Sequence, residues 1–282
     1  MSINNRSRVS HFVAAFVASI GTSTLLSAPG WAATFSSSEA TFEVNNFSVL
    51  PLDVTALHDA NTQVIAPDGL VKSNADADAL FLTDALNQSS SRANGSSSSV
   101  VSGSGSSYSG LAQSIAQVVG YSFQIKRGET FSFDFTDALT LKTSLDQPGL
   151  ETATAIGTIS LGLFDAADPN NLTLLDFLTI AGNLGTPGNS NALTVDQSAG
   201  VTFKAKQTSL DSALDGKQAL ASASVQGTFS RFFANPTSLL LVESGSNQAV
   251  AAVPEPSNVL ASLICVGLLG IKFLRKPRLN QP

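Results

Sequence analysis

The clearest pattern in the sequence is an alternation of apolar and polar residues with a period of two. Phe131-Ser132-Phe133-Asp134-Phe135 alternates in this way, and the stretch 219–230 does so over a greater length. Successive side chains of a β-strand point to opposite faces, so each stretch predicts a strand with one buried face. Further strands are predicted at 41–48, 121–126, 155–164, 172–180, 201–206 and 238–243.

Turn-forming residues separate these stretches. Two clusters, 165–171 and 182–189, are rich in aspartate, asparagine, glycine and proline. Short antiparallel strands joined by such turns predict an all-β fold, either a β-sandwich or a jelly-roll. Two stretches have the alternative of a short helix, 111–119 and 209–214, where Ser209 would be the N-cap.

A serine-rich segment interrupts the pattern at 87–110. It contains 12 serines, with glycine and asparagine between them. Such a composition offers little apolar surface to bury, so the segment is predicted to be a disordered loop. We expect one domain over 34–250 that contains this loop. The alternative is a linker between 34–86 and 111–250.

The N-terminal residues have the layout of a secretory signal peptide. Arg6 and Arg8 precede an apolar stretch at 12–20, and small residues follow as far as Ala33. A positive region, a short apolar region and a small-residue cleavage site define such a signal. We therefore expect 1–33 to be removed on export, with the mature chain beginning near Ala33 or Thr34.

The C-terminal residues combine a rigid motif, an apolar run and a basic end. Pro254-Glu255-Pro256 is held extended by its prolines, and the uncharged apolar run 259–271 follows it. This predicts a transmembrane segment at about 258–274. Cations remain on the cytoplasmic side of a membrane, so we expect the segment to be stopped by a basic cluster of Lys272, Arg275, Lys276 and Arg278.

This arrangement over 253–280 resembles the PEP-CTERM sorting domain of Gram-negative bacteria and cyanobacteria. The resemblance rests on Pro254-Glu255-Pro256, on Gly267-Leu268-Leu269-Gly270 and on Arg275-Lys276. It implies that an exosortase, a membrane-embedded cysteine transpeptidase, recognises the Pro-Glu-Pro motif and cuts near it. It also implies an association with exopolysaccharide, beside which such proteins tend to be found.

The composition of the segment between the two signals excludes several classes of function. It carries nine basic and 20 acidic residues over 34–253, a net charge of −11 with histidine neutral. Such a charge repels nucleic acid, so no nucleic-acid partner is expected. The one cysteine, Cys265, lies in the predicted membrane segment. The exported part therefore has neither a disulfide nor a thiol nucleophile, and we expect no cofactor.

Few residues suggest chemistry. His58 is the one histidine of the exported part, and we interpret it as a surface loop residue. Aspartates that cluster at Asp76 and Asp78, and again at Asp165 and Asp168, are weak candidates for calcium ligands. The alternatives are a solvated strand face for the first pair and a turn built on aspartate side chains for the second.

The expected function is that of a non-enzymatic surface or extracellular-matrix protein, exported and then held by its C-terminal membrane segment at least transiently. The alternative is an extracellular carbohydrate-binding module or glycoside hydrolase on a jelly-roll. That alternative requires a concave face with exposed aromatics and, for hydrolysis, two carboxylates.

Overall fold

The computed structural model describes residues 33–84, 90–188, 191–212 and 216–253. The chain divides into two units, Met1–Trp31 and Ala32–Pro282, and all described residues belong to the second. They form ten strands: β1 (Ala33–Asn45), β2 (Asp53–Leu82), β3 (Arg92–Ile125), β4 (Glu129–Ser144), β5 (Thr152–Asp165), β6 (Thr173–Thr186), β7 (Ala192–Gln197), β8 (Val201–Ser212), β9 (Gln218–Phe233) and β10 (Thr237–Val253).

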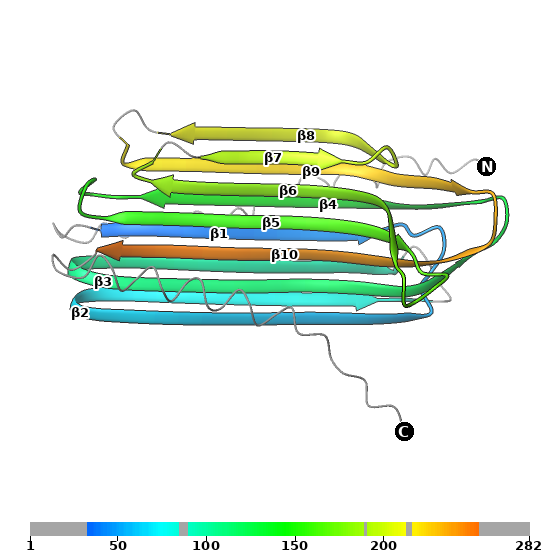
Figure 1. Cartoon of the computed structure of the whole chain (residues 1–282), viewed down its shortest axis with the longest axis horizontal. Coiled ribbons are helices and arrows are strands. Elements are labelled where there is room, and N and C mark those ends of the chain that lie inside the picture. The colour runs from blue at the N-terminus through cyan, green and yellow to red at the C-terminus, as the bar shows by residue number, and fades with distance from the viewer. Residues whose placement is uncertain (1–32, 85–89, 189–190, 213–215, 254–282) are drawn as a thin grey trace, which may run out of the picture. The chain divides into compact units, whose positions relative to one another are not determined.

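Every strand pairing is antiparallel, which confirms the predicted all-β fold (Figure 1). The predicted alternation is also confirmed. Phe131, Phe133 and Phe135 of β4 are buried, and β9 buries every second residue from Ala219 to Phe229. The period-two pattern therefore identified strands whose inner face fills the core.

The strands form one continuous sheet in the order β7-β6-β5-β10-β3-β1-β4-β9-β8, with β2 paired along β3. The sheet folds over within β3. Residues 92–104 of β3 pair with β1, whereas residues 108–125 pair with β10. The long β2–β3 hairpin doubles back with this fold, as Figure 1 shows at its lower edge. The result is two facing layers in a nearly closed, barrel-like sheet.

Glycines allow the hairpin to double back. Gly105 has a φ of +117°, a region that L side chains rarely adopt. A Cβ at Gly105 would lie 2.5 Å from the Cα of Gly69 on β2. The backbones of the two strands therefore approach at the corner more closely than any side chain would permit.

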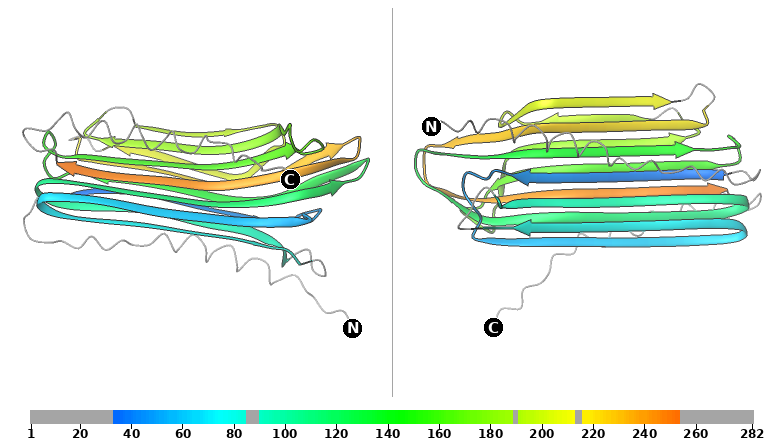
Figure 2. Two further views of the ribbon diagram at one scale, coloured as in Figure 1. Left: turned by 60° about the horizontal axis from the view of Figure 1, so that its bottom comes forward. Right: turned by 180° about the vertical axis from the view of Figure 1, so that it is seen from behind.

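The two layers pack face to face. β1 contacts β10 and β5, and β4 contacts β5 and β6, although none of these pairs is hydrogen-bonded as neighbouring strands. From behind, β1 lies in front of β10 (Figure 2). Between the layers, one end of the core is filled by phenylalanine rings, among which Phe133 stacks on Phe229 with centroids 4.9 Å apart.

Polar contacts join the layers near the edge opposite the hairpin. The carboxylate of Asp176 on β6 accepts hydrogen bonds from Arg231 Nη1 of β9 (2.6 Å), Ser198 Oγ (2.7 Å) and the backbone N–H of Gly200 (3.1 Å). Residues 198–200 form the turn between β7 and β8. A single buried carboxylate therefore ties β6 to β9 and to this turn.

The serine-rich segment corrects the predicted disordered loop at 87–110, because residues 92–110 are part of β3. Buried hydroxyl and amide groups bond across the layers. Asn247 Nδ2 of β10 donates to the carbonyl of Ser97 at 2.8 Å, and the hydroxyls of Ser99 and Ser114 lie 3.0 Å apart. Hydrogen bonds between small polar side chains therefore help to hold the layers together in this segment, where few apolar side chains are available to be buried.

Three further predictions are corrected. The possible helix at 111–119 is part of β3, and Ser209 to Ser212 of the other possible helix belong to β8. In both places pairing with neighbouring strands overrides the local preference. His58 lies on β2, opposite Ala116, and not in a loop. Residues 53–65 of β2 are largely exposed on both faces, so no alternation revealed this strand.

Candidate functional site

The predicted sorting residues lie outside the described residues. These are the motif Pro254, Glu255 and Pro256 and the basic cluster of Lys272, Arg275, Lys276 and Arg278. The predicted membrane segment and all but the last residue of the predicted signal peptide also lie outside them. Within the described ranges, no helix has the length and apolar character needed to cross a membrane. Strand β10 ends at Val253, directly before the motif.

Asp76 and Asp78 lie on β2, opposite Ser98 and Ser96 of β3. Both are exposed and share one face of the strand with Asn74. No third histidine, cysteine or carboxylate joins them, since the described residues contain no group of three such side chains able to hold a metal ion. Calcium prefers six or more oxygen ligands, so this face offers an incomplete site.

Asp165 and Asp168 lie at the β5–β6 turn, where their carboxylates bind the backbone of that turn. Asp165 Oδ1 accepts a hydrogen bond from the N–H of Ala167 at 2.9 Å, and Asp168 Oδ1 accepts one from the N–H of Asn170 at 3.0 Å. These are the contacts of Asx-turns. The geometry favours the turn-forming interpretation over a calcium site.

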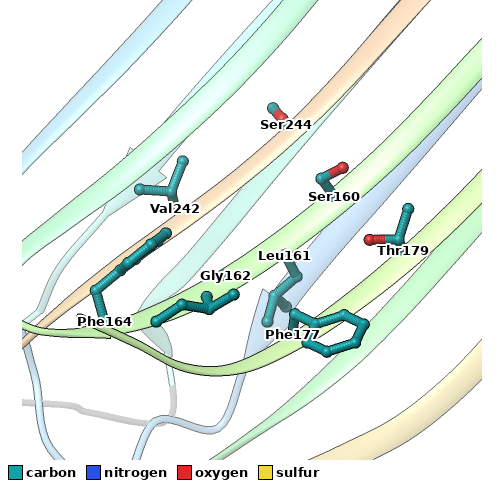
Figure 3. A pocket seen from close by; sticks show the side chains of 9 residues that line it. Ser160, Leu161, Gly162, Phe164, Phe177, Thr179, Val242 and Ser244 are labelled. Carbon is teal, nitrogen blue, oxygen red and sulfur yellow. The ribbon is translucent and has the colours of Figure 1, made fainter. Parts of the chain in front are cut away.

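A shallow hollow of about 380 Å³ lies on the outer face of β5, β6 and β10 (Figure 3). Outward residues alternate there with the buried ones. Phe164 and Phe177 contribute apolar surface, and Ser160, Thr179 and Ser244 contribute hydroxyls. No lining residue is ionisable; the others are Leu161, Gly162, Leu174 and Val242.

A pair of carboxyl groups is enclosed between the layers. Asp137 of β4 and Glu243 of β10 are both 0% exposed, and the two groups interact with each other. Among the described residues, none of their four carboxyl oxygens has a hydrogen-bond partner of ordinary geometry. Buried polar groups are normally hydrogen-bonded, as the hydroxyls of Ser97 and Ser99 are. The acid pair is an exception to this rule.

Burial raises the pKa of the Asp137 carboxyl to about 7. Burial also raises the pKa of Glu243 well above its usual value, and the charge of Asp137 and of Glu43 on β1 raises it further. Low-dielectric surroundings disfavour the ionised form, and a second carboxylate disfavours it again. Both effects favour the protonated form of the pair.

No sequence pattern pointed to this pair as a site. Asp137 and Glu243 come from strands far apart in the sequence, and their proximity arises only when the layers face each other. The one local signal was that Asp137 continues the inward series of Phe131, Phe133 and Phe135 on β4.

Comparison of the chain with protein-family models, with curated proteins and with solved structures gives no match in any of the three.

Proposed function

We propose that this chain is a non-enzymatic exported protein of the cell surface or extracellular matrix, a β-sandwich-like domain sorted through Pro254-Glu255-Pro256 by an exosortase. The observation that carries the proposal is the order of the C-terminal segments: a proline-rigid motif, an apolar run and a basic end. The motif directly follows Val253, the last residue of β10. A processing enzyme could therefore cut the tail without removing a strand from the sheet.

Two features support a non-enzymatic role. The facing carboxyls Asp137 and Glu243 are sealed in the core, where no substrate reaches them. The hollow on the outer face has no ionisable lining residue to act as a general acid or base. A glycoside hydrolase needs two accessible carboxyl groups on either side of the scissile bond, so neither place provides a hydrolytic site.

Alanine replacement of the motif tests the sorting proposal. In a host that contains an exosortase, Pro254→Ala, Glu255→Ala and Pro256→Ala together are expected to abolish processing and retain the protein in the membrane fraction. The matched control replaces Thr208, Ser209 and Leu210, three exposed residues of β8, by alanine. Unchanged processing and location of the motif variant would contradict the proposal.

The hollow favours carbohydrate binding as a second candidate function. Apolar rings beside hydroxyl groups suit a sugar, whose ring presents C–H groups on its faces and hydroxyls at its edge. Phe177→Ala is expected to weaken binding of the protein to the exopolysaccharide of its host by at least tenfold in a sedimentation assay. Phe232→Ala is the control, since Phe232 is 63% exposed on β9 outside the hollow. Equal binding by both variants and the wild type would exclude the hollow as the carbohydrate-binding site.

A further inference from the structure

None of the described residues beside the acid pair in the sheet can neutralise a negative charge. Asp137 lies beside Phe42 of β1 and Val225 of β9, and Glu243 lies beside Val118 of β3 and Leu161 of β5. All four neighbours are buried. The next inward positions along β4 and β10 are also without polar side chains: Phe135, Leu139, Leu241 and Gly245.

The charged groups on the strands packed against the pair give no compensation. Glu43 of β1 is itself acidic and opposes ionisation of Glu243. Lys142 of β4 belongs to the outward series of that strand. Arg231 of β9 forms an ion pair with Asp176 of β6 and is therefore engaged by another carboxylate. With both carboxyls ionised, two charges would repel each other inside an apolar shell.

We propose that Asp137 and Glu243 form a proton latch, a pair of facing carboxyls that holds the two layers together while it retains a proton and forces them apart when it is fully ionised. The protonated member can donate to the other, which would place a hydrogen bond between the two layers. Full ionisation replaces that attraction by repulsion at the same point. Separation of the layers or entry of water relieves the repulsion.

The sign of the pH dependence follows from proton binding. The unfolded chain releases the protons of these carboxyls near pH 4, as ordinary aspartate and glutamate do. The folded chain keeps them to higher pH because their pKa values are raised. The folded state therefore binds more protons, and the free energy of unfolding falls as the pH rises from about 4 through 7 and above. Each retained proton raises the unfolding constant about tenfold per pH unit in this range.

Urea unfolding of the full chain in a non-ionic detergent, followed by circular dichroism from pH 4 to pH 9, tests the latch. The unfolding constant of the wild type is expected to rise about tenfold per pH unit for each retained proton. The Asp137→Asn, Glu243→Gln double variant is expected to lose this dependence. The control is the Glu39→Gln, Asp211→Asn double variant, which makes the same chemical changes at exposed positions of β1 and β8 and should behave as the wild type. An unaltered pH profile in the Asp137, Glu243 variant would overturn the proposal.

Infrared spectroscopy gives a second readout that does not depend on unfolding. At pH 7 the wild-type protein is expected to show the C=O band of a protonated carboxyl, and the Asp137→Asn, Glu243→Gln double variant to lose it. A wild type without that band at pH 7 refutes the latch. The latch is also refuted if manganese or calcium at pH 9 raises the unfolding midpoint of the wild type but not of the double variant, because the pair would then be a cation site.

Discussion

Phe133 shows how single residues hold the inner face of the sheet. Its ring stacks on Phe229 and lies 5.7 Å from that of Phe131 and 5.8 Å from that of Phe47. Phe47 follows Asn46, whose positive φ of 55° turns the chain at the end of β1. Residues from β4, β9 and the β1–β2 connection therefore meet at one ring, and the loss of that ring leaves a cavity that none of them can fill.

Phe133→Ala is expected to lower the free energy of unfolding by about 3–5 kcal/mol, the usual cost of removing a buried aromatic ring. Phe232→Ala, at the exposed end of β9, should change it by less than about 0.5 kcal/mol. Urea denaturation measures both values. A loss below about 1 kcal/mol for Phe133→Ala would mean that the phenylalanine cluster does not form the core.

At the scale of elements, the doubled-back hairpin of β2 and β3 decides the architecture. It turns one sheet into two facing layers, and its corner depends on the positive φ of Gly105. Gly105→Ala is expected to cost about 1–3 kcal/mol of stability because of the backbone conformation, and the close approach of Gly69 adds to the cost. Gly185→Ala on β6 is the control: its φ is ordinary, and a Cβ there would meet nothing within 4 Å. Equal stability of the two variants, compared by denaturation, would contradict this account of the corner.

The elements also show what a sequence pattern can predict. The alternation in β4 and β9 predicted those strands because one face of each is apolar and buried. The first part of β2 was missed because residues 53–65 are exposed on both faces and follow no period, whereas the strand face offered as the alternative for Asp76 and Asp78 does lie on β2. The first half of β3 was missed because glycine and serine interrupt its buried face, where the hydroxyl of Ser97 has a partner on a distant strand, Asn247. The Asp137–Glu243 pair was missed because the two residues are far apart in the sequence and come together only when the layers pack face to face.

At the scale of the whole molecule, the layers and the proposed sorting signals form a consistent scheme. The first strand begins at Ala33, where the predicted signal peptide ends, and the last strand ends at Val253, where the sorting motif begins. The strands between them contain no cysteine and are stabilised by the core and the buried polar network.

Mass spectrometry of the two ends of the mature protein, isolated from a host with an exosortase, tests the central claim most directly. The account predicts an N-terminus near Ala33 or Thr34 and a C-terminus close to Pro254-Glu255-Pro256. Recovery of the intact chain from Met1 to Pro282 in the cytosol would contradict it.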